Sequence, residues 1–212
     1  MKGDALKARL VAGAQEMGLA LDVAQAASLI SLTFELREWN RRVNLTAITE
    51  PREMVDKHLL DSLSIQPQLH GRRIADIGTG AGFPGLPLAI VNPRRSFTLI
   101  EATGKKCQFV RHAVETFRIE NVEVVQARAE AWKPRAQFDS VIARALGKLA
   151  DFVRVAGHLC AQDGTMLAMK GRHPTAEMHA LPPGWRVLAL HDLAVPGLLA
   201  ERCVVELGRS AR

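Results

Sequence analysis

The 212-residue sequence contains no tyrosine, and its aromatic rings come from only seven Phe and three Trp residues. Modules that read single-stranded RNA on a stacking platform need several exposed aromatic rings. Few rings would be left for such a platform once a hydrophobic core has been built. The composition therefore argues against this class of RNA-binding module.

Cysteine is also scarce, and Cys107, Cys160 and Cys203 lie far apart with no Cys-x-x-Cys pair or Cys/His cluster. This pattern supports neither a disulfide framework nor a structural zinc site. We expect three reduced, mostly buried thiols, no metal, and a cytoplasmic protein. The longest apolar stretches, such as residues 86–91, are far too short to span a membrane, and the N-terminus does not resemble a signal peptide.

Acidic residues are the minority charge, because 28 Lys and Arg residues against 22 Asp and Glu residues give a net charge of +6. Residues 1–65 carry a net charge of −1, residues 66–150 carry +6 and residues 151–212 carry +1. A charge of +6 is also common for solubility, but its concentration in the middle of the chain favours a polyanionic partner.

Residues 1–69 have a helical pattern and are predicted to form an N-terminal helical extension. Asp22 is a candidate N-cap for the main helix of this segment. Residues at helical spacing then line one face of this helix: Leu29, Leu32, Leu36 and Trp39.

Residues 70–212 alternate between short strands and helices, which predicts an α/β fold with a mostly parallel, Rossmann-like sheet of seven strands. Pro196 and Gly197 interrupt the last connection, so the final two strands should pair antiparallel. The predicted strands are Ile74–Ile77, Phe97–Ile100, Val122–Gln126, Phe138–Ala143, Thr165–Lys170, Arg186–His191 and Arg202–Leu207. The predicted helices are Pro84–Val91, Lys105–Phe117 and Leu146–Leu159.

A glycine-rich turn, residues 76–85 (DIGTGAGFPG), follows the first predicted strand and opens a helix. Glycines permit positive φ and allow a ligand to lie against bare backbone. Three alternating glycines exceed what a tight turn needs, so we interpret this segment as a cofactor site.

Two classes of cofactor compete for this turn. Read from Gly80, the segment is G-x-G-x-x-G with Glu101 lying 21 residues on, as in dinucleotide-binding enzymes. Read from Asp76, it is D-x-G-x-G-x-G, the first motif of class I S-adenosylmethionine methyltransferases. A dinucleotide fingerprint should start at Gly78, where the strand ends, and Phe83 then stands in place of its third glycine. A methyltransferase is favoured, and a NAD-dependent reductase stays as the alternative.

Polar residues follow the other predicted strands at the edge where ligands of open α/β sheets bind. Glu101 ends the second strand, where a carboxylate can accept both ribose hydroxyls of an adenosine. Ala129 and Glu130 follow the third strand, where adenine would lie against backbone. Arg144 ends the fourth strand.

The sequence resembles the bacterial 16S rRNA guanine-N7 methyltransferases, the RsmG (GidB) family. The resemblance extends from about residue 29 to residue 170 and weakens after that. The matching motifs are Trp39-Asn40, Asn44-Leu45-Thr46, His58-Leu59-Leu60-Asp61-Ser62, residues 76–87, Gly104-Lys105-Lys106, Arg128-Ala129-Glu130, Arg144-Ala145 and Lys170-Gly171.

This resemblance implies a class I fold that binds S-adenosyl-L-methionine, with 16S rRNA or the small ribosomal subunit as partner. It implies cofactor contacts from Gly78, Phe83, Ala129, Glu130 and Arg144, in addition to Asp76, Gly80 and Glu101. It also implies a basic rim that faces RNA and contains Lys105, Arg128 and Lys170. The family often has Asp-Ser after the second strand, whereas this sequence has Glu101-Ala102.

The implied reaction needs no catalytic acid or base. Guanine N7 has a free lone pair and no proton, so alignment of nucleophile, methyl group and sulfur should suffice. Because positive charge builds on the purine, we expect Arg144 to contact the cofactor, O6 or a phosphate, but not N7. The N7 edge is inaccessible in A-form RNA, so the target guanine should lie in a loop or be flipped out.

A monomer is the default oligomeric state. His58 and Asp61 lie one helical turn apart, and two roles are open for them: closing the site, or a structural hydrogen bond between helix and sheet, which is favoured. A methyltransferase-fold RNA-binding or assembly factor without activity is the second alternative function.

Overall fold

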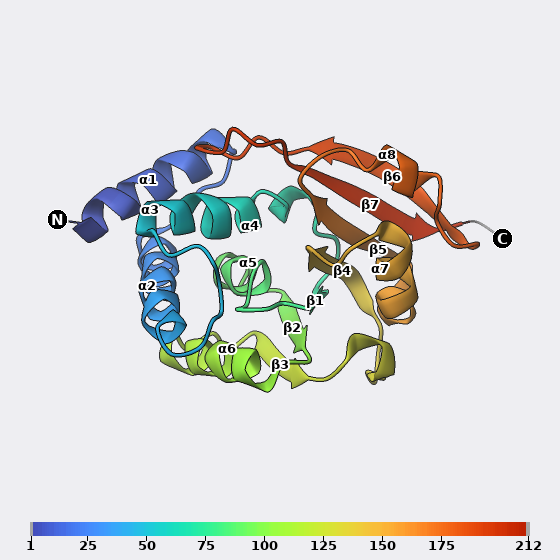
Figure 1. Cartoon of the computed structure of the whole chain (residues 1–212), viewed down its shortest axis with the longest axis horizontal. Helices are drawn as coiled ribbons and strands as arrows, with labels where there is room; N and C mark the ends of the chain where they lie inside the picture. Colours follow the sequence, from blue (N-terminus) through green and yellow to red (C-terminus); the bar gives the residue numbers. More distant parts are fainter. Residues whose placement is uncertain (1, 211–212) are drawn as a thin grey trace.

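The computed structural model describes residues 2–210. Its centre is one seven-stranded sheet with the strand order β3-β2-β1-β4-β5-β7-β6 (Figure 1). The strands are β1 Arg73–Ile77, β2 Ser96–Glu101, β3 Val122–Gln126, β4 Phe138–Arg144, β5 Cys160–Lys170, β6 Trp185–Asp192 and β7 Cys203–Arg209.

Strands β1 to β5 pair in parallel, whereas β7 pairs antiparallel with both β5 and β6. All seven predicted strands are therefore present, and the antiparallel pairing of the last two is confirmed. Because β7 runs against its neighbours, its first residue lies at the same sheet edge as the last residues of β4 and β5. Cys203 pairs with Lys170 at that edge.

Helices cover both faces of the sheet. Asp22 caps α2 as predicted, because its side chain accepts a hydrogen bond from the Gln25 backbone N–H and the Gln25 side chain accepts one from the Asp22 N–H. The longer helices are α1 Lys2–Glu16, α2 Val23–Asn40, α5 Gly85–Val91, α6 Gly104–Thr116 and α7 Leu149–Ala156. The short helices are α3 Pro51–Met54, α4 Asp61–Leu63, η2 Gln66–Gln68, η3 Ala129–Ala131, η4 Gly157–Leu159 and α8 Thr175–Met178.

The predicted helix over residues 146–159 begins three residues later than expected. Ala145 and Gly147 adopt φ angles of 61° and 79°, which no α-helix contains. This left-handed segment separates the end of β4 from α7. Helix α7 then ends at Ala156 and continues as the 3₁₀ turn η4.

A π-helix, η1 Val55–Leu60, interrupts the helical run between α3 and α4. Helical periodicity alone did not predict it. The Asp61 N–H donates to the carbonyls of Asp56 and His58, not to that of Lys57 four residues before it. The Lys57 carbonyl therefore does not accept the hydrogen bond that it would accept from Asp61 in an α-helix.

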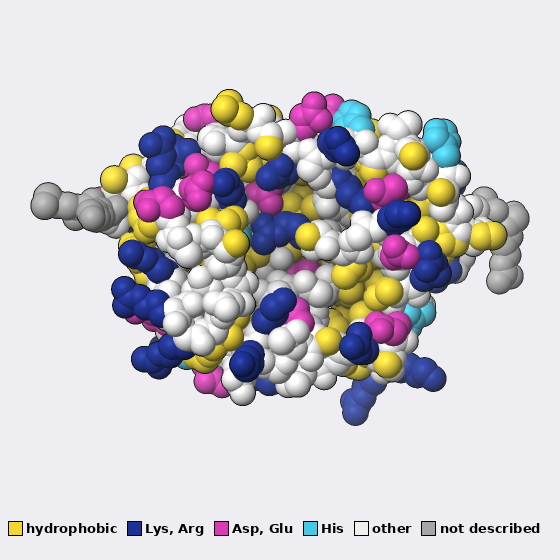
Figure 2. Space-filling model, in the orientation of Figure 1, with side chains coloured by type: hydrophobic (Ala, Val, Ile, Leu, Met, Phe, Trp, Pro, Cys, Tyr) yellow, Lys and Arg dark blue, Asp and Glu magenta, His cyan; other side chains and the backbone are white. Residues whose placement is uncertain are grey.

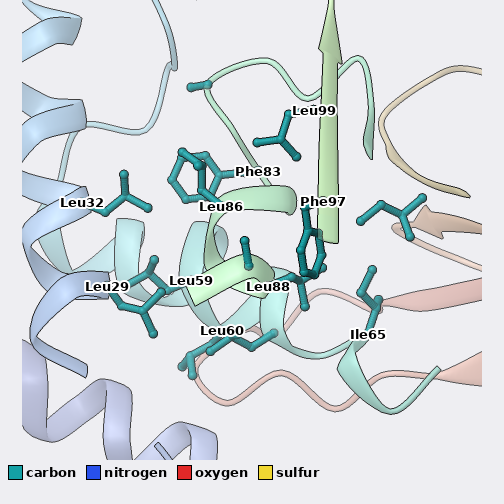
Figure 3. Packing of buried hydrophobic residues seen from close by; sticks show 14 of the residues in the cluster. Leu29, Leu32, Leu59, Leu60, Ile65, Phe83, Leu86, Leu88, Phe97 and Leu99 are labelled. Atoms are coloured by element: carbon teal, nitrogen blue, oxygen red, sulfur yellow. The ribbon is translucent and has the colours of Figure 1, made fainter. Parts of the chain in front are cut away.

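The N-terminal helices share one hydrophobic core with one face of the sheet. Leu29 and Leu32 of α2 and Leu59 and Leu60 of η1 point toward a set of buried side chains from α5 and β2 (Figure 3): Leu86, Leu88, Phe97 and Leu99. A second core on the opposite face packs α7 against the sheet. The three thiols are free and buried, as predicted. No helix among residues 2–210 is long and apolar enough to cross a membrane.

Candidate functional site

The glycine turn lies at the carboxyl edge of the sheet between β1 and α5. Gly78, Gly80 and Gly82 have φ angles of 64°, 61° and 87°, a conformation that favours glycine. The N–H groups of Gly78 and Thr79 donate to the Ile100 carbonyl, which ties the turn to β2. A Cβ built on Gly80 would meet nothing closer than the Gly78 carbonyl oxygen at 3.9 Å, so the space beside this residue is open.

Asp76 lies beneath the turn and is fully buried. Its Oδ2 accepts hydrogen bonds from the Thr79 hydroxyl at 2.6 Å and from the Gly85 N–H at 2.9 Å. Burial raises the pKa of the Asp76 carboxyl to about 6. The side chain holds the two ends of the turn together, so its support for a cofactor acts through the shape of the backbone.

Glu101 extends from the end of β2 back to the same turn. One carboxylate oxygen accepts the Gly80 N–H at 3.0 Å and the other accepts the Thr103 N–H at 2.8 Å. The side chain is only 7% exposed. The Glu101 side chain is longer than that of Asp and reaches the Gly80 N–H of the glycine turn. The lone pairs that these two bonds leave unused on both carboxylate oxygens can still accept hydroxyl groups.

The residues predicted to flank adenine form the 3₁₀ turn η3 after β3. Ala129 is buried, whereas the side chains of Arg128 and Glu130 are exposed. Arg128 Nη1 and Glu130 Oε1 are 4.0 Å apart, at the outer limit of an ion pair. The Arg128 side chain therefore extends from the surface, where it is accessible to a polyanion.

Arg144 connects the end of β4 to the π-helix. Its Nη1 donates to the Lys57 carbonyl at 3.0 Å and to Asp61 Oδ2 at 3.1 Å. The first bond uses a carbonyl of the π-helix that does not accept the Asp61 N–H. The irregularity in the helix thus sets the position of the guanidinium group.

His58 lies between Arg144, Phe83 and Thr46. Its ring stacks on the Phe83 ring with 4.8 Å between centroids, and Nε2 is 3.0 Å from Thr46 Oγ1. Burial, reinforced by the charge of Arg144, lowers the pKa of His58 to about 3. The imidazole is therefore neutral at physiological pH. Phe83 is buried, so its ring serves this packing.

The segment before α3 is fixed by Asn40 at the end of α2. The Asn40 side chain accepts the N–H groups of Leu45 and Thr46 and donates to the Thr46 carbonyl. Residues from distant sequence motifs thus form one connected group: Asn40, Thr46, His58 and Arg144. The expected helix-to-sheet bond is present as the pairing of Asp61 with Arg144.

Arg202, just before β7, is a site residue that the sequence reasoning placed only in a strand. Its Nε donates to Asp61 Oδ1 at 2.8 Å, so the buried Asp61 carboxylate bridges Arg144 and Arg202. The sequence signal that could have predicted Arg202 as a site residue was a basic residue at the start of an antiparallel last strand. Such a residue must lie at the edge where the parallel strands end.

The residues of the predicted basic rim differ in how accessible they are. Lys105 is exposed near the start of α6. Lys170 is less accessible, because its Nζ donates to the Gly147 carbonyl at 2.6 Å and to Glu177 at 2.8 Å. Figure 2 shows Lys and Arg side chains spread over the visible face, several of them around a hollow near its middle.

The strand order, the glycine turn after β1 and the carboxylate after β2 define a class I methyltransferase fold. TrmN from Thermus thermophilus has this fold, with a TM-score of 0.57 and 19% identity, over 82% of this chain and 53% of that chain. The glycopeptide N-methyltransferase MtfA, solved with S-adenosyl-L-methionine, matches with a TM-score of 0.59 and 12% identity, over 73% of this chain and 88% of that chain.

The family model of GidB, rRNA small subunit methyltransferase G, matches residues 25–205. A ribosomal RNA small subunit methyltransferase G from Xanthomonas euvesicatoria pv. vesicatoria is 47% identical over 205 residues, which cover 95% of this chain and 97% of the relative. One from Nitrosococcus oceani is 45% identical over 191 residues, covering 90% and 89%. The chain belongs to the rRNA small subunit methyltransferase G family, and the suggested resemblance is confirmed.

Proposed function

We propose that the protein transfers a methyl group from S-adenosyl-L-methionine to N7 of a loop guanine in 16S rRNA. The observation that carries this proposal is membership in the rRNA small subunit methyltransferase G family over residues 25–205. A methyltransferase family also favours the methyl donor over NAD as the ligand of the glycine turn.

The residues around the turn fit this cofactor. Gly80 leaves backbone uncovered beside open space, whereas a Cβ on Gly78 would meet the Leu146 side chain at 3.3 Å. Glu101 presents a carboxylate at the end of the neighbouring strand. In the proposed arrangement, Glu101 accepts the ribose hydroxyls, and Ala129 and Glu130 flank adenine. S-adenosyl-L-methionine supplies an electrophilic methyl group on a sulfonium sulfur.

The protein's part in the chemistry is positioning. N7 needs no deprotonation, so the rate depends on how well the base and the methyl group are aligned. His58 is neutral beside Arg144 and therefore adds no positive charge where the purine becomes cationic. Arg144 is held by Lys57 and Asp61, which keeps its guanidinium group in a defined orientation.

The remaining assignments extend this proposal. Residues 70–212 act as the methyltransferase core and residues 1–69 as a helical extension that helps to build the substrate side. The protein acts as a cytoplasmic monomer, on naked 16S rRNA or on the small ribosomal subunit. Lys105 and Arg128, both exposed, contact RNA phosphates.

The test is methyl transfer from labelled S-adenosyl-L-methionine by the purified protein to 16S rRNA and to small subunits that lack the modification. N7-methylguanine at one loop position is the expected product. Comparison of the two substrates decides between naked and assembled rRNA. Tight binding of rRNA without any transfer would instead support a non-catalytic assembly factor, and saturable binding of NAD alone would support a reductase.

A further inference from the structure

A cleft of about 450 Å³ opens beside Arg144 at the carboxyl edge of the sheet. We infer that this cleft binds a phosphate of the RNA strand next to the target guanine, with Arg144 and Arg202 as its ligands and Asp61 as their positioning residue. The inference rests on the proposed function and adds a subsite to it. Its lining includes Lys57, His58, Asp61, Arg144, Lys170 and Arg202.

The two arginines are oriented by one buried carboxylate. Asp61 is 3% exposed and accepts Nη1 of Arg144 at 3.1 Å and Nε of Arg202 at 2.8 Å. Both arginine side chains are about one-quarter exposed. Asp61 thus fixes two guanidinium groups that arrive from β4 and from the start of β7, while both still reach solvent.

The arginines have donors left for a ligand. A guanidinium group carries five N–H bonds, and Arg202 uses Nε for Asp61 and Nη1 for the Glu201 carbonyl. Its Nη2 has no partner among residues 2–210. Nη2 of Arg144 is no closer than 3.5 Å to His58 Nδ1, which is a weak contact. Planar forks of this kind suit the bidentate recognition of phosphate.

The charges in the cleft favour a single anion. Lys57 pairs with Glu53 and Lys170 pairs with Glu177, so both lysines are already neutralised. Arg144 and Arg202 share the one carboxylate of Asp61, which leaves one net positive charge. One phosphodiester, with one negative charge, would balance it.

The position of the cleft favours RNA over the methionine carboxylate of the cofactor as the source of this anion. The cleft is lined by the ends of β4 and β5 and by the start of β7. Arg144 lies next to the glycine turn, with its Cζ 5.9 Å from the Phe83 ring centroid. Arg202 precedes β7, which β4 and β5 separate from β1 and the turn, and neither the turn nor Glu101 lines the cleft. The anion therefore enters from the substrate side.

The experiment compares Arg202→Gln with Arg186→Gln, a matched charge change on an exposed side chain. Arg186 pairs with Gly208 at the opposite end of the sheet. RNA affinity is measured against salt concentration, and S-adenosyl-L-methionine affinity is measured by calorimetry. We expect Arg202→Gln to reduce the slope of log K against log salt by about 0.7, the value for one single-stranded phosphate contact. Cofactor affinity should stay within about twofold, and Arg186→Gln should change neither quantity.

Two controls keep the inference testable. Arg202→Lys retains the charge and should keep the salt slope while losing part of the affinity, because ammonium lacks the fork. Asp61→Asn removes a negative charge, so loss of charge alone would leave RNA affinity equal or higher. If Asp61 also positions the two arginines, the Asp61→Asn variant should show at least a tenfold lower kcat/KM, without a fall in RNA affinity.

An unchanged salt slope in Arg202→Gln would overturn the inference, and so would a loss of cofactor affinity with intact RNA binding. The second result would assign the anion to the cofactor. Failure of the proposed function is distinguishable, because the wild-type protein would then transfer no methyl group to rRNA.

Discussion

Arg144, the last residue of β4, donates a hydrogen bond to the backbone carbonyl of Lys57 across 3.0 Å. In the π-helix the Asp61 N–H bonds to the carbonyls of Asp56 and His58 and not to that of Lys57. The π-helix and the end of β4 are therefore joined by a direct hydrogen bond. π-Bulges are frequent at functional sites, and here the bulge supplies an acceptor for an arginine.

Arg144→Lys should lower kcat/KM for methyl transfer by tenfold or more. A single ammonium group cannot reproduce the planar geometry that contacts Lys57 and Asp61, and each hydrogen bond to a charged group contributes about 1.5–3 kcal/mol. Steady-state methylation of small subunits measures the effect. A kcat/KM within twofold of the wild-type value would contradict the role of Arg144 in alignment.

Glu101→Gln should weaken S-adenosyl-L-methionine binding about tenfold, because an amide has one acceptor oxygen for a turn that uses two. Glu101→Asp should do the same, since its shorter side chain cannot reach the Gly80 N–H. Calorimetric titration with the cofactor measures both variants. An unchanged dissociation constant would remove Glu101 from the cofactor site.

Gly80→Ala and Gly85→Ala should separate cofactor binding from folding. A Cβ at Gly80 enters open space at a cost of about 1–2 kcal/mol for the left-handed conformation, and it should block the cofactor. A Cβ at Gly85 would lie 2.2 Å from Leu99 Cδ2, so this variant should lose stability. Thermal melting and cofactor titration distinguish the two effects, and equal stability losses would refute the distinction.

His58 should make the protein less stable in acid. Its folded pKa of about 3 lies below the unfolded value of 6.5, so the unfolded chain binds more protons between these values. The stabilisation is complete above pH 6.5 and is lost as the pH falls below it, by at most about 1.4 kcal/mol per pH unit. Between pH 7.5 and 5.5, wild type should lose about 1 kcal/mol more than His58→Gln in urea unfolding. Parallel losses in both proteins would contradict the burial of a neutral imidazole.

Deletion of residues 1–69 should abolish cooperative folding. The deletion uncovers one face of the main core, including Leu86, Leu88 and Phe97, which belong to the same buried cluster as residues of α2 and η1 in the intact chain. Apolar surface of this kind drives aggregation or a loosely packed state. Near-ultraviolet circular dichroism and dye binding test this expectation, and a sharp melting transition in the truncated protein would contradict it.

Local chemistry explains which elements could be predicted from the sequence. The strands are apolar runs bounded by turns, Asp22 and Gln25 form a capping box within four residues, and the glycine turn needs φ angles that few other residues adopt. Each of these signals acts over a few positions. The π-helix and the left-handed residues before α7 were missed because contacts from distant strands stabilise them.

The amino-acid pattern alone determined the α/β class, the position of the glycine turn after the first strand and the family, because periodicity, turn residues and sequence motifs are local properties. Tertiary structure decided which charged groups meet. It placed Asp61 between Arg144 and Arg202, which lie 83 and 141 positions away in the chain. Such pairs depend on where strand ends converge in space, and no local pattern encodes that distance.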